Sequence, residues 1–418
     1  MFRESGRVRP GVQMSMNSAE RGLPLSTGRI VDTRSPFVRL AELVADVKPG
    51  RPVIDLGVGE PKHPVPDFVG PVIAAHIKDF GRYPRNEGTP QFRRAAAEWA
   101  ARRYRLGRVP DPDREVLVLN GSREGLFLGA LAAKRHVANR AGRPAILVPN
   151  PFYAAYSAGA VAADCEVVYM PTTRETRFLP DLDALDGALL ARTVAMFLAT
   201  PSNPQGAVAD LAYLQRVTAL ARRYGFLLFC DECYSEIYTQ APPAGALEAA
   251  GDQFENVVLF QSLSKRSNLP GLRVGFAMGD RRFIAKFLEL RNVAAPQVPI
   301  PTQEVGIAAY GDEVHVEANR DLYRAKFDLV DQIIGDRYGY RRPAGGFFLW
   351  LDVGALGGSE VVAARLWREA GVRVLPGRYI ARDQADGRNP GADFIRVAMV
   401  HDKETTAEAL HRIVAVLG

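Results

Sequence analysis

Short apolar runs alternate with stretches of helical periodicity through the central part of the sequence. Helical periodicity covers 123–141, 211–224 and 281–290. The apolar runs are Val116–Leu119, Ile146–Val148, Val167–Tyr169, Met196–Ala199, Leu227–Phe229, Val257–Phe260 and Val274–Met278. Strands that alternate with helices predict a largely parallel sheet of seven strands with helices on both faces. Ligands of such sheets bind at the carboxyl ends of the strands, so the residues after each run are the first candidates for a site.

Side chains of several chemical types follow these runs. They are Gly121, Ser122 and Arg123 after the first run, Tyr153 after the second, Asn203 after the fourth, Asp231 and Tyr234 after the fifth, and Ser262, Ser264 and Lys265 after the sixth. The turn at Gly121 opens a helix, whose free amides and dipole bind anions. Packing alone does not explain an amide, a carboxylate, a phenol and an amine at neighbouring strand ends.

Lys265 combines the features of a lysine that reacts with a carbonyl group. Two serines precede it, and Arg273 lies eight residues further along the chain. A lysine amine is nucleophilic only when neutral, and desolvation or a nearby cation lowers its pKa toward that state. Ser262, Ser264 and Arg273 offer donors for a phosphate group, the arginine as a bidentate fork. Taken alone, Lys265 is also compatible with a solvated loop.

Both ends of the chain predict a second, smaller α/β domain. Beyond Arg291 the expected elements are a proline-rich segment at 295–301, helices at 313–334, 359–370 and 403–417, and strands at 345–351, 372–375 and 394–398. We therefore predict a flexible N-terminal arm at 1–27, which lacks the apolar core of a secretory signal, and an N-terminal part of the small domain at 28–61. The large domain is expected at 62–300 and the C-terminal part of the small domain at 301–418.

Composition excludes several classes of function. The net charge is +6, but the basic residues are scattered and no basic stripe is interleaved with aromatic residues, so we expect no nucleic-acid partner. No run of 18 apolar residues occurs, so we expect no membrane partner. Three cysteines indicate a reducing, cytoplasmic location. Cys230 and Cys233 form a CxxC pair without further ligands, which favours core positions over a metal or redox site.

The motifs resemble those of the class I aminotransferases, fold-type I enzymes that depend on pyridoxal 5′-phosphate. The matching residues are Tyr83-Pro84 with Gly88, Gly121-Ser122, Asn203-Pro204, Asp231 with Tyr234, Ser262-x-Ser264-Lys265, Arg273 and Arg396. Their order and spacing agree from about Val31 to Gly418. The resemblance implies a fold-type I pyridoxal-phosphate transferase that exchanges an amino group between an amino acid, with glutamate as the expected donor, and a keto acid.

The resemblance also implies a role for each residue around the cofactor ring. Lys265 would hold the cofactor as a Schiff base and then move the substrate proton. Asp231 would keep the pyridine nitrogen protonated, which makes the ring an electron sink. Tyr234 and Asn203 would bind the 3′-oxygen, and Tyr153 would stack on the ring. A tyrosine buried in the core is the alternative for Tyr153.

Further implied roles concern the phosphate, the substrate and a second subunit. Gly121, Ser122, Arg123, Ser262, Ser264 and Arg273 would bind the cofactor phosphate. Tyr83 would reach the phosphate of the neighbouring subunit, which implies a homodimer with shared active sites. Arg396 would clamp the substrate α-carboxylate, helped by Gly59 and Asn203, although a surface ion pair is its alternative. The resemblance implies no metal.

Within the family, four stretches are similar to the succinyldiaminopimelate aminotransferases of lysine and peptidoglycan biosynthesis. They are Gly59–Pro64, Asn120–Glu124, Asp231–Tyr238 and Ser262–Asn268. Two segments depart from that pattern. Arg85-Asn86-Glu87 replaces small neutral residues, and Val293–Pro296 replaces an aromatic-histidine-glycine stretch.

Both departing segments are expected at the mouth of the active site. They motivate an alternative, a pyridoxal-phosphate enzyme of specialised metabolism that performs elimination, replacement or cyclisation. A non-catalytic regulator of the same fold is a third hypothesis, but the arm before Thr27 is too short and too poor in apolar residues for a DNA-binding domain. Arg85, Arg123 and Arg266 are candidates for binding a distal acidic group of the substrate, and solvated surface positions are the alternative for each.

Overall fold

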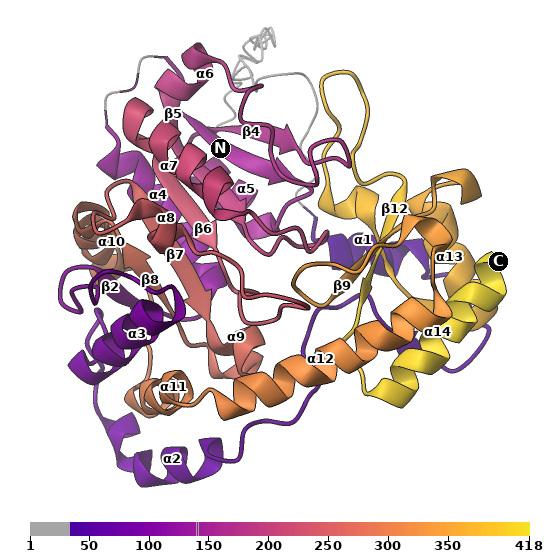
Figure 1. The fold of residues 1–418 in the computed structure, drawn as a ribbon, viewed down its shortest axis with the longest axis horizontal. Helices are drawn as coiled ribbons and strands as arrows, with labels where there is room; N and C mark the ends of the chain where they lie inside the picture. Colours follow the sequence, from indigo (N-terminus) through magenta and orange to yellow (C-terminus); the bar gives the residue numbers. More distant parts are fainter. Residues whose placement is uncertain (1–33, 139, 141) are drawn as a thin grey trace, which may run out of the picture. The chain divides into compact units, whose positions relative to one another are not determined.

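The computed structural model describes residues 34–138, 140 and 142–418, and Figure 1 shows their arrangement. The expected arm at 1–27 lies outside these residues. The α-helices are α1 Pro36–Leu43, α2 Val69–Ala75, α3 Pro90–Arg103, α4 Ser122–His136, α5 Ala154–Ala162, α6 Gly187–Arg192, α7 Leu211–Tyr224, α8 Ala246–Ala250, α9 Leu263–Arg266, α10 Arg281–Ala294, α11 Ile300–Gly311, α12 Val314–Ile333, α13 Ser359–Ala370 and α14 Lys403–Leu417.

A seven-stranded sheet forms the centre of the larger part of the molecule. Its strands are β2 Val116–Leu119, β3 Ala145–Asn150, β4 Glu166–Pro171, β5 Thr193–Ala199, β6 Leu227–Asp231, β7 Val257–Ser262 and β8 Gly275–Gly279. They lie in the order β2-β8-β7-β6-β5-β3-β4. The five strands β7-β6-β5-β3-β4 run parallel, and β8 runs antiparallel to both of its neighbours. All seven predicted strands and the mostly parallel α/β class are confirmed.

Side-chain alternation along the strands places helices on both faces of this sheet. In β5, Met196 and Leu198 pack on one side, whereas Ala195 and Phe197 pack on the other. The first side is covered by α3, α7, α8 and α11, and the second by α4, α5 and α10. Because both faces are buried, the strands read as nearly continuous apolar runs.

A smaller sheet lies beside the large one and contributes the strand that carries Arg396. It contains β9 Phe348–Asp352, β11 Leu375–Pro376 and β12 Phe394–Ala398, in the antiparallel order β11-β12-β9. The two-residue strands β1 Ile54–Asp55 and β10 Val372–Arg373 pair in parallel next to it. Residues of these strands share one hydrophobic core with α12, α13 and α14, which Figure 1 shows in orange and yellow.

The structure differs from the predicted elements at several points. The expected strand at 372–375 is two short strands, β10 and β11, that belong to different sheets. The proline-rich segment, for which no helix had been predicted, leads directly into α11, which starts at Ile300 and packs against α3. Helices α2, α5, α6, α8 and α9 had not been predicted from the periodicity. The division into large and small domains stays a prediction.

None of the helices in the described ranges is both long enough and apolar enough to cross a membrane.

Candidate active site

Lys265 lies on α9, the single helical turn that directly follows β7. Its Nζ donates a hydrogen bond to the carbonyl oxygen of Gly59 at 2.5 Å. Burial lowers the pKa of the Lys265 amine to about 8, and the nearby guanidinium groups of Arg396 and Arg273 act in the same direction. A large fraction of the amine is therefore neutral near pH 8, which is the state that reacts with a carbonyl group.

Asp231 ends β6, on the strand adjacent to that of Lys265. Its Oδ2 accepts a hydrogen bond from the hydroxyl of Tyr156 at 2.7 Å, and its Oδ1 accepts one from the amide of Cys233 at 3.3 Å. Burial raises the pKa of the carboxyl, because these two bonds only partly offset the loss of water. A positive charge placed against Asp231 would therefore stabilise its ionised form.

Arg396 lies at the centre of β12 and is 5 % exposed. Its guanidinium donates to the carbonyl oxygen of Gly57 at 2.7 Å and to Oδ1 of Asn203 at 3.1 Å, and it lies 4.4 Å from the centroid of the Phe348 ring. Burial lowers its pKa to about 10, so the group stays charged at neutral pH. Within the described residues Arg396 forms no ion pair, and its Nε has no hydrogen-bond partner. A buried guanidinium with only neutral partners is suited to an incoming carboxylate.

The start of α4, together with α9 and Arg273, forms a cradle for an anion. Gly121 precedes α4 with a φ of 76°, and a Cβ at this position would lie 2.3 Å from Nη2 of Arg273. Arg273 donates to the carbonyl oxygens of Pro270 at 2.7 Å and of Asn120 at 3.1 Å, which fixes its guanidinium beside the α4 amides. The hydroxyl groups of Ser262, at the end of β7, and Ser264, on α9, lie 2.8 Å apart. Donors of these types at a helix N-terminus match a phosphate group.

Three further predicted residues, Arg123, Tyr153 and Tyr234, make polar or aromatic contacts. The guanidinium of Arg123 donates to the hydroxyl of Tyr153, which is the N-cap residue of α5. The Tyr153 ring meets Tyr156 edge-on at 5.7 Å between centroids. The ring of Tyr234 contacts Phe347 and Phe348 edge-on, at 5.3 and 5.8 Å.

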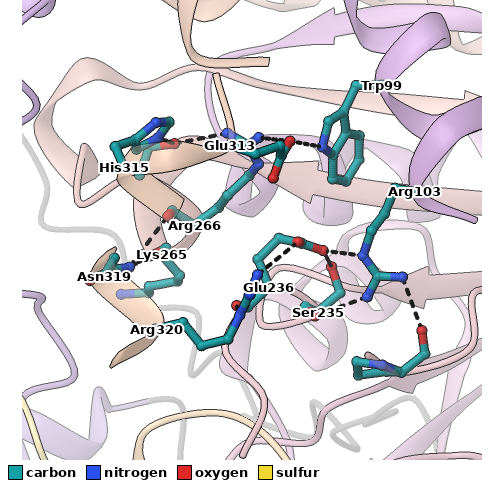
Figure 2. A network of polar contacts seen from close by, with 12 residues as sticks. Trp99, Arg103, Ser235, Glu236, Lys265, Arg266, Glu313, His315, Asn319 and Arg320 are labelled. Carbon is teal, nitrogen blue, oxygen red and sulfur yellow. Dashed lines mark hydrogen bonds and ion pairs between the residues drawn. The ribbon is translucent and has the colours of Figure 1, made fainter. Parts of the chain in front are cut away.

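Three other predicted residues, Tyr83, Gly59 and Arg266, have surroundings that the sequence did not predict. Tyr83 is 95 % exposed. The carbonyl of Gly59 accepts from Lys265, and Arg396 instead donates to the carbonyl of Gly57. Arg266 is fully buried and donates to Glu313 at 2.6 Å and to the carbonyl of Ala309 (Figure 2), so it is not available to a substrate.

Sequence reasoning missed Tyr156, Gly57 and the Phe347-Phe348 pair. Tyr156 follows Tyr153 by three residues, so both tyrosines lie on one side of α5, and this spacing is a signal that the sequence contained. The phenylalanines follow two glycines at the start of β9. Nothing in the sequence around Gly57 distinguishes its carbonyl from that of Gly59, because only the fold brings Arg396 to it.

Comparison with known proteins agrees with this geometry. Residues 51–413 match the family model for aminotransferase class I and II. An LL-diaminopimelate aminotransferase of Desulforudis audaxviator is 34% identical over 391 residues, which cover 91% of this chain and 95% of that protein. The chain belongs to the class I and II aminotransferases.

Solved structures of aminotransferases have the same fold. An aminotransferase of Neisseria meningitidis superposes with a TM-score of 0.86 at 38% identity, over 92% of this chain and 98% of that one. A probable N-succinyldiaminopimelate aminotransferase of Thermus thermophilus gives 0.80 at 27% identity, over 92% and 100%. The fold-type I assignment is thereby confirmed, and the chain is a pyridoxal-phosphate-dependent transaminase.

The residues of this aminotransferase fit pyridoxal phosphate. The cradle at Gly121 leaves no room for a Cβ beside Arg273, as expected where backbone amides approach a phosphate closely. Asp231 needs a neighbouring positive charge, which a protonated pyridine supplies. Lys265 has an amine with a lowered pKa. In the part of the chain that the structure describes, no cluster of three or more metal-ligating side chains is found.

Proposed function

We propose that this aminotransferase exchanges an amino group between glutamate and a dicarboxylic keto acid of the diaminopimelate class, either free or N-acylated. The names of its relatives, LL-diaminopimelate aminotransferase and N-succinyldiaminopimelate aminotransferase, support this substrate class. The observation that carries the proposal is the buried, unpaired guanidinium of Arg396. The family assignment does not favour the alternative of elimination, replacement or cyclisation.

Arg396 would bind the α-carboxylate of both substrates in turn. The bidentate fork and the face of Phe348 fix the plane of the guanidinium, and Asn203 holds one of its nitrogens at 3.1 Å. A carboxylate bound in this plane would orient the substrate Cα toward Lys265. Glu and diaminopimelate-class substrates share this α-amino-acid end, so one clamp can serve both halves of the exchange.

Lys265 would act as the acid and base at the substrate carbon. Pyridoxal phosphate, when bound, supplies an aldehyde that exchanges amines and a ring that accepts the electron pair left at Cα. The neutral Nζ of Lys265 takes the proton from the substrate Cα and later returns a proton to the keto acid carbon in the reverse half of the exchange. An amine with a pKa of about 8 is poised for transfer in both directions near neutral pH.

The remaining residues would bind and orient the cofactor. Asp231, held by Tyr156, keeps a proton on the pyridine nitrogen, and Tyr153 covers the ring. Tyr234 and Asn203 bind the ring oxygen. The phosphate is assigned to the backbone and side chains of the cradle, which comprises Gly121, Ser122, Arg123, Ser262, Ser264 and Arg273.

We further propose a homodimer in which Tyr83 reaches the site of the neighbouring subunit. The side chain of Tyr83 is 95 % exposed in the single chain, which a contact with a second subunit would explain. A cytoplasmic location is supported by the three cysteines, all of which are free and buried.

The test compares the responses of the enzyme to three amino compounds, followed by the absorbance of the cofactor. Glutamate, LL-diaminopimelate and N-succinyl-LL-diaminopimelate are added separately to the enzyme loaded with pyridoxal phosphate, and cofactor absorbance and keto acid are followed. Glutamate and one diaminopimelate compound should change the spectrum, and Lys265→Ala should abolish the response. Lys403→Ala, an exposed change on α14, is the matched control. Silence with all three compounds, or release of ammonia in place of amino transfer, would refute the proposal.

A further inference from the structure

A series of hydrogen-bonded polar side chains, buried or half-buried, leads to the backbone carbonyls of Lys265 and Arg266. Lys326 lies on α12, and its Nζ contacts the carbonyl oxygens of Met399 at 2.5 Å and of His401 at 2.9 Å. The same Nζ lies 2.7 Å from Nε2 of His63. Lys326 is 2 % exposed. Among the described residues no carboxylate lies at hydrogen-bond distance from this buried amine, and burying an ammonium without such a partner costs free energy, so its presence calls for a function.

The series of hydrogen bonds continues from His63 to α9, the helix that carries Lys265. Nδ1 of His63 lies 2.7 Å from Oδ1 of Asn319. Nδ2 of Asn319 then donates to the carbonyl oxygens of Lys265 at 3.2 Å and of Arg266 at 3.3 Å. Figure 2 shows Asn319 bridging to the α9 backbone. Helix α9 has one turn, and its last carbonyls have no partners within the helix, so the amide of Asn319 caps it.

Helix geometry explains why one histidine can link these two side chains. Asn319 and Lys326 are seven residues apart on α12, which places them on the same face two turns apart. His63 bridges this interval, with its ring 4.5 Å from that of Tyr323, which lies between them on the helix. His63 belongs to the stretch Gly59–Pro64, which carries part of the family resemblance but in which His63 had been assigned no role.

The series of hydrogen bonds ends in backbone carbonyl oxygens on both sides, and this fixes the direction of every hydrogen bond in it. Carbonyls only accept, so Lys326 donates at one end and Asn319 donates through Nδ2 at the other. His63 must then accept at Nε2 and donate from Nδ1 to Oδ1 of Asn319. Asn268 supports this orientation by donating to the same Oδ1 at 2.9 Å.

The protonation state of His63 agrees with this direction. Burial lowers the pKa of His63 to about 4, which keeps the imidazole neutral with one proton. Burial also lowers the pKa of Lys326 to about 7, while Asp402 opposes the shift. The three acceptors around Nζ of Lys326 are all satisfied only by the protonated amine.

We propose that Lys326, His63 and Asn319 form a positioning relay that caps α9 and holds Lys265 in register with the strand carrying Arg396. Met399 and His401, at one end of the relay, follow Arg396 by three and five residues. Lys265 is at the other end. The relay therefore links the group that binds the substrate carboxylate to the group that moves the substrate proton. This inference rests on the proposed role of Lys265.

The test compares two substitutions of His63 that differ in polarity. His63→Phe keeps an aromatic ring beside Tyr323 but removes both nitrogens. His63→Gln restores one acceptor for Lys326 and one donor for Asn319. Asn319→Asp is a second, isosteric probe, because a carboxylate accepts from His63 but cannot donate to the α9 carbonyls. His411→Phe, on the exposed side of α14, is the matched control.

Two readouts separate the relay from a general loss of packing. In single turnovers with glutamate, His63→Phe and Asn319→Asp should lower the rate at saturation about tenfold, because Lys265 is misplaced, with less than about a twofold change in half-saturating concentration. His63→Gln and His411→Phe should stay within about twofold of the wild type. Amide hydrogen exchange at 263–270, measured with and without cofactor, should accelerate in the two impaired variants and be restored in His63→Gln.

The relay would be overturned if amide hydrogen exchange at 263–270 were as slow in His63→Phe as in the wild type. Equal impairment of His63→Gln and His63→Phe would also overturn it. The exchange measurement needs no substrate and no active lysine, so it is decisive even when glutamate does not react. Failure of the proposed function appears separately, as a cofactor spectrum that glutamate and the diaminopimelate compounds leave unchanged.

Discussion

At the scale of single residues, the site combines ionisable groups whose pKa values burial has shifted and that form no ion pair with any other described residue. Burial lowers the pKa of Lys265 to about 8 and that of Arg396 to about 10, and it raises that of Asp231. Structural ion pairs elsewhere, such as Arg103 with Glu236 at 2.5 Å (Figure 2), satisfy their charges within the chain. The charges of the site await a cofactor and a substrate, which is the pattern expected of functional groups.

The lowered pKa of Lys265 makes a prediction about the cofactor-free protein. Only the neutral amine is acylated, so the rate of Lys265 modification by acetic anhydride should rise with pH to a midpoint near 8. An exposed lysine has its midpoint near about 10.4. Mass spectrometry of the Lys265 peptide, normalised to the exposed Lys403, measures the two rates in one sample.

The lowered pKa of Lys265 also determines how its contribution to the free energy of unfolding changes with pH. Between the folded-state pKa of about 8 and the ordinary 10.5, the unfolded chain binds more protons than the folded one. The contribution of Lys265 to the free energy of unfolding is therefore fully present above the ordinary pKa and is lost as the pH falls through about 8. Arg396→Met removes a cation that lowers this pKa, so the acylation midpoint should move to higher pH. A midpoint above 10 in the wild type would contradict the placement of Lys265.

Residue types at strand ends were predictable from the sequence, whereas their contacts were not. Lys265, Asp231 and Asn203 follow apolar runs, so parallel-strand topology predicts that they gather at one edge of the sheet. The bond from Tyr156 to Asp231 and the choice of Gly57 as acceptor for Arg396 depend on long-range geometry. No local pattern carries that information.

At the scale of elements, the N-terminus of α4 is built for close approach of an anion, and Gly121→Ala tests it. The new Cβ would lie 2.3 Å from Nη2 of Arg273, and the φ of 76° would strain any residue other than glycine. Displacement of Arg273 should weaken pyridoxal phosphate binding about 10- to 100-fold, or about 1.4 to 2.7 kcal/mol. Titration of the cofactor-free protein measures the dissociation constant.

Gly251→Ala is the matched control for backbone strain. Gly251 has a φ of 68°, and a Cβ there meets nothing within 4 Å. The variant should lose about 1 kcal/mol of unfolding free energy and keep the wild-type affinity for the cofactor. Equal affinities of Gly121→Ala and the wild type would show that the phosphate does not bind at α4.

Helices and strands with a clear hydrophobic periodicity were predictable, whereas a helix that begins among prolines was not. The bounds of α7, α13, α14 and β12 agree with the predicted ranges. Helix α11 was missed because Pro296, Pro299 and Pro301 indicate a break in the chain. In the structure Pro301 occupies the first turn of α11, where its missing amide hydrogen costs nothing.

At the scale of the whole molecule, two large side chains project into solvent: Tyr83, which precedes the departing segment Arg85-Asn86-Glu87, and Val293, which begins the other departing segment. Tyr83 is 95 % and Val293 85 % exposed. The second segment is also tied to the phosphate cradle, because Nδ2 of Asn120 donates to the carbonyl oxygen of Pro296 at 2.6 Å. In the proposed homodimer, the second subunit would cover these two side chains. Neither exposure could be inferred from sequence, since both depend on how the chain folds around each segment.

Shared active sites predict that two inactive variants restore each other when mixed. Lys265→Ala removes the reactive amine, and Tyr83→Asp places a carboxylate where a phosphate of the neighbouring subunit is proposed to bind. A mixed dimer holds one site with both intact residues, because that site takes Lys265 from one subunit and Tyr83 from the other. Random exchange of subunits at equal amounts should therefore restore about a quarter of the wild-type sites. Sedimentation should give about twice the chain mass of 45.7 kDa.

The control for this complementation uses two residues that belong to the same subunit. Asp231 ends β6 and Lys265 follows the adjacent parallel strand β7 of the same subunit, so a mixed dimer of Asp231→Ala and Lys265→Ala has no site with both residues intact. That mixture should stay inactive under the exchange conditions that restore the first one. Recovery in both mixtures would point to contaminating wild-type protein. Recovery in neither, with dimers present by sedimentation, would place Tyr83 outside the neighbouring site and leave each subunit with a complete site of its own.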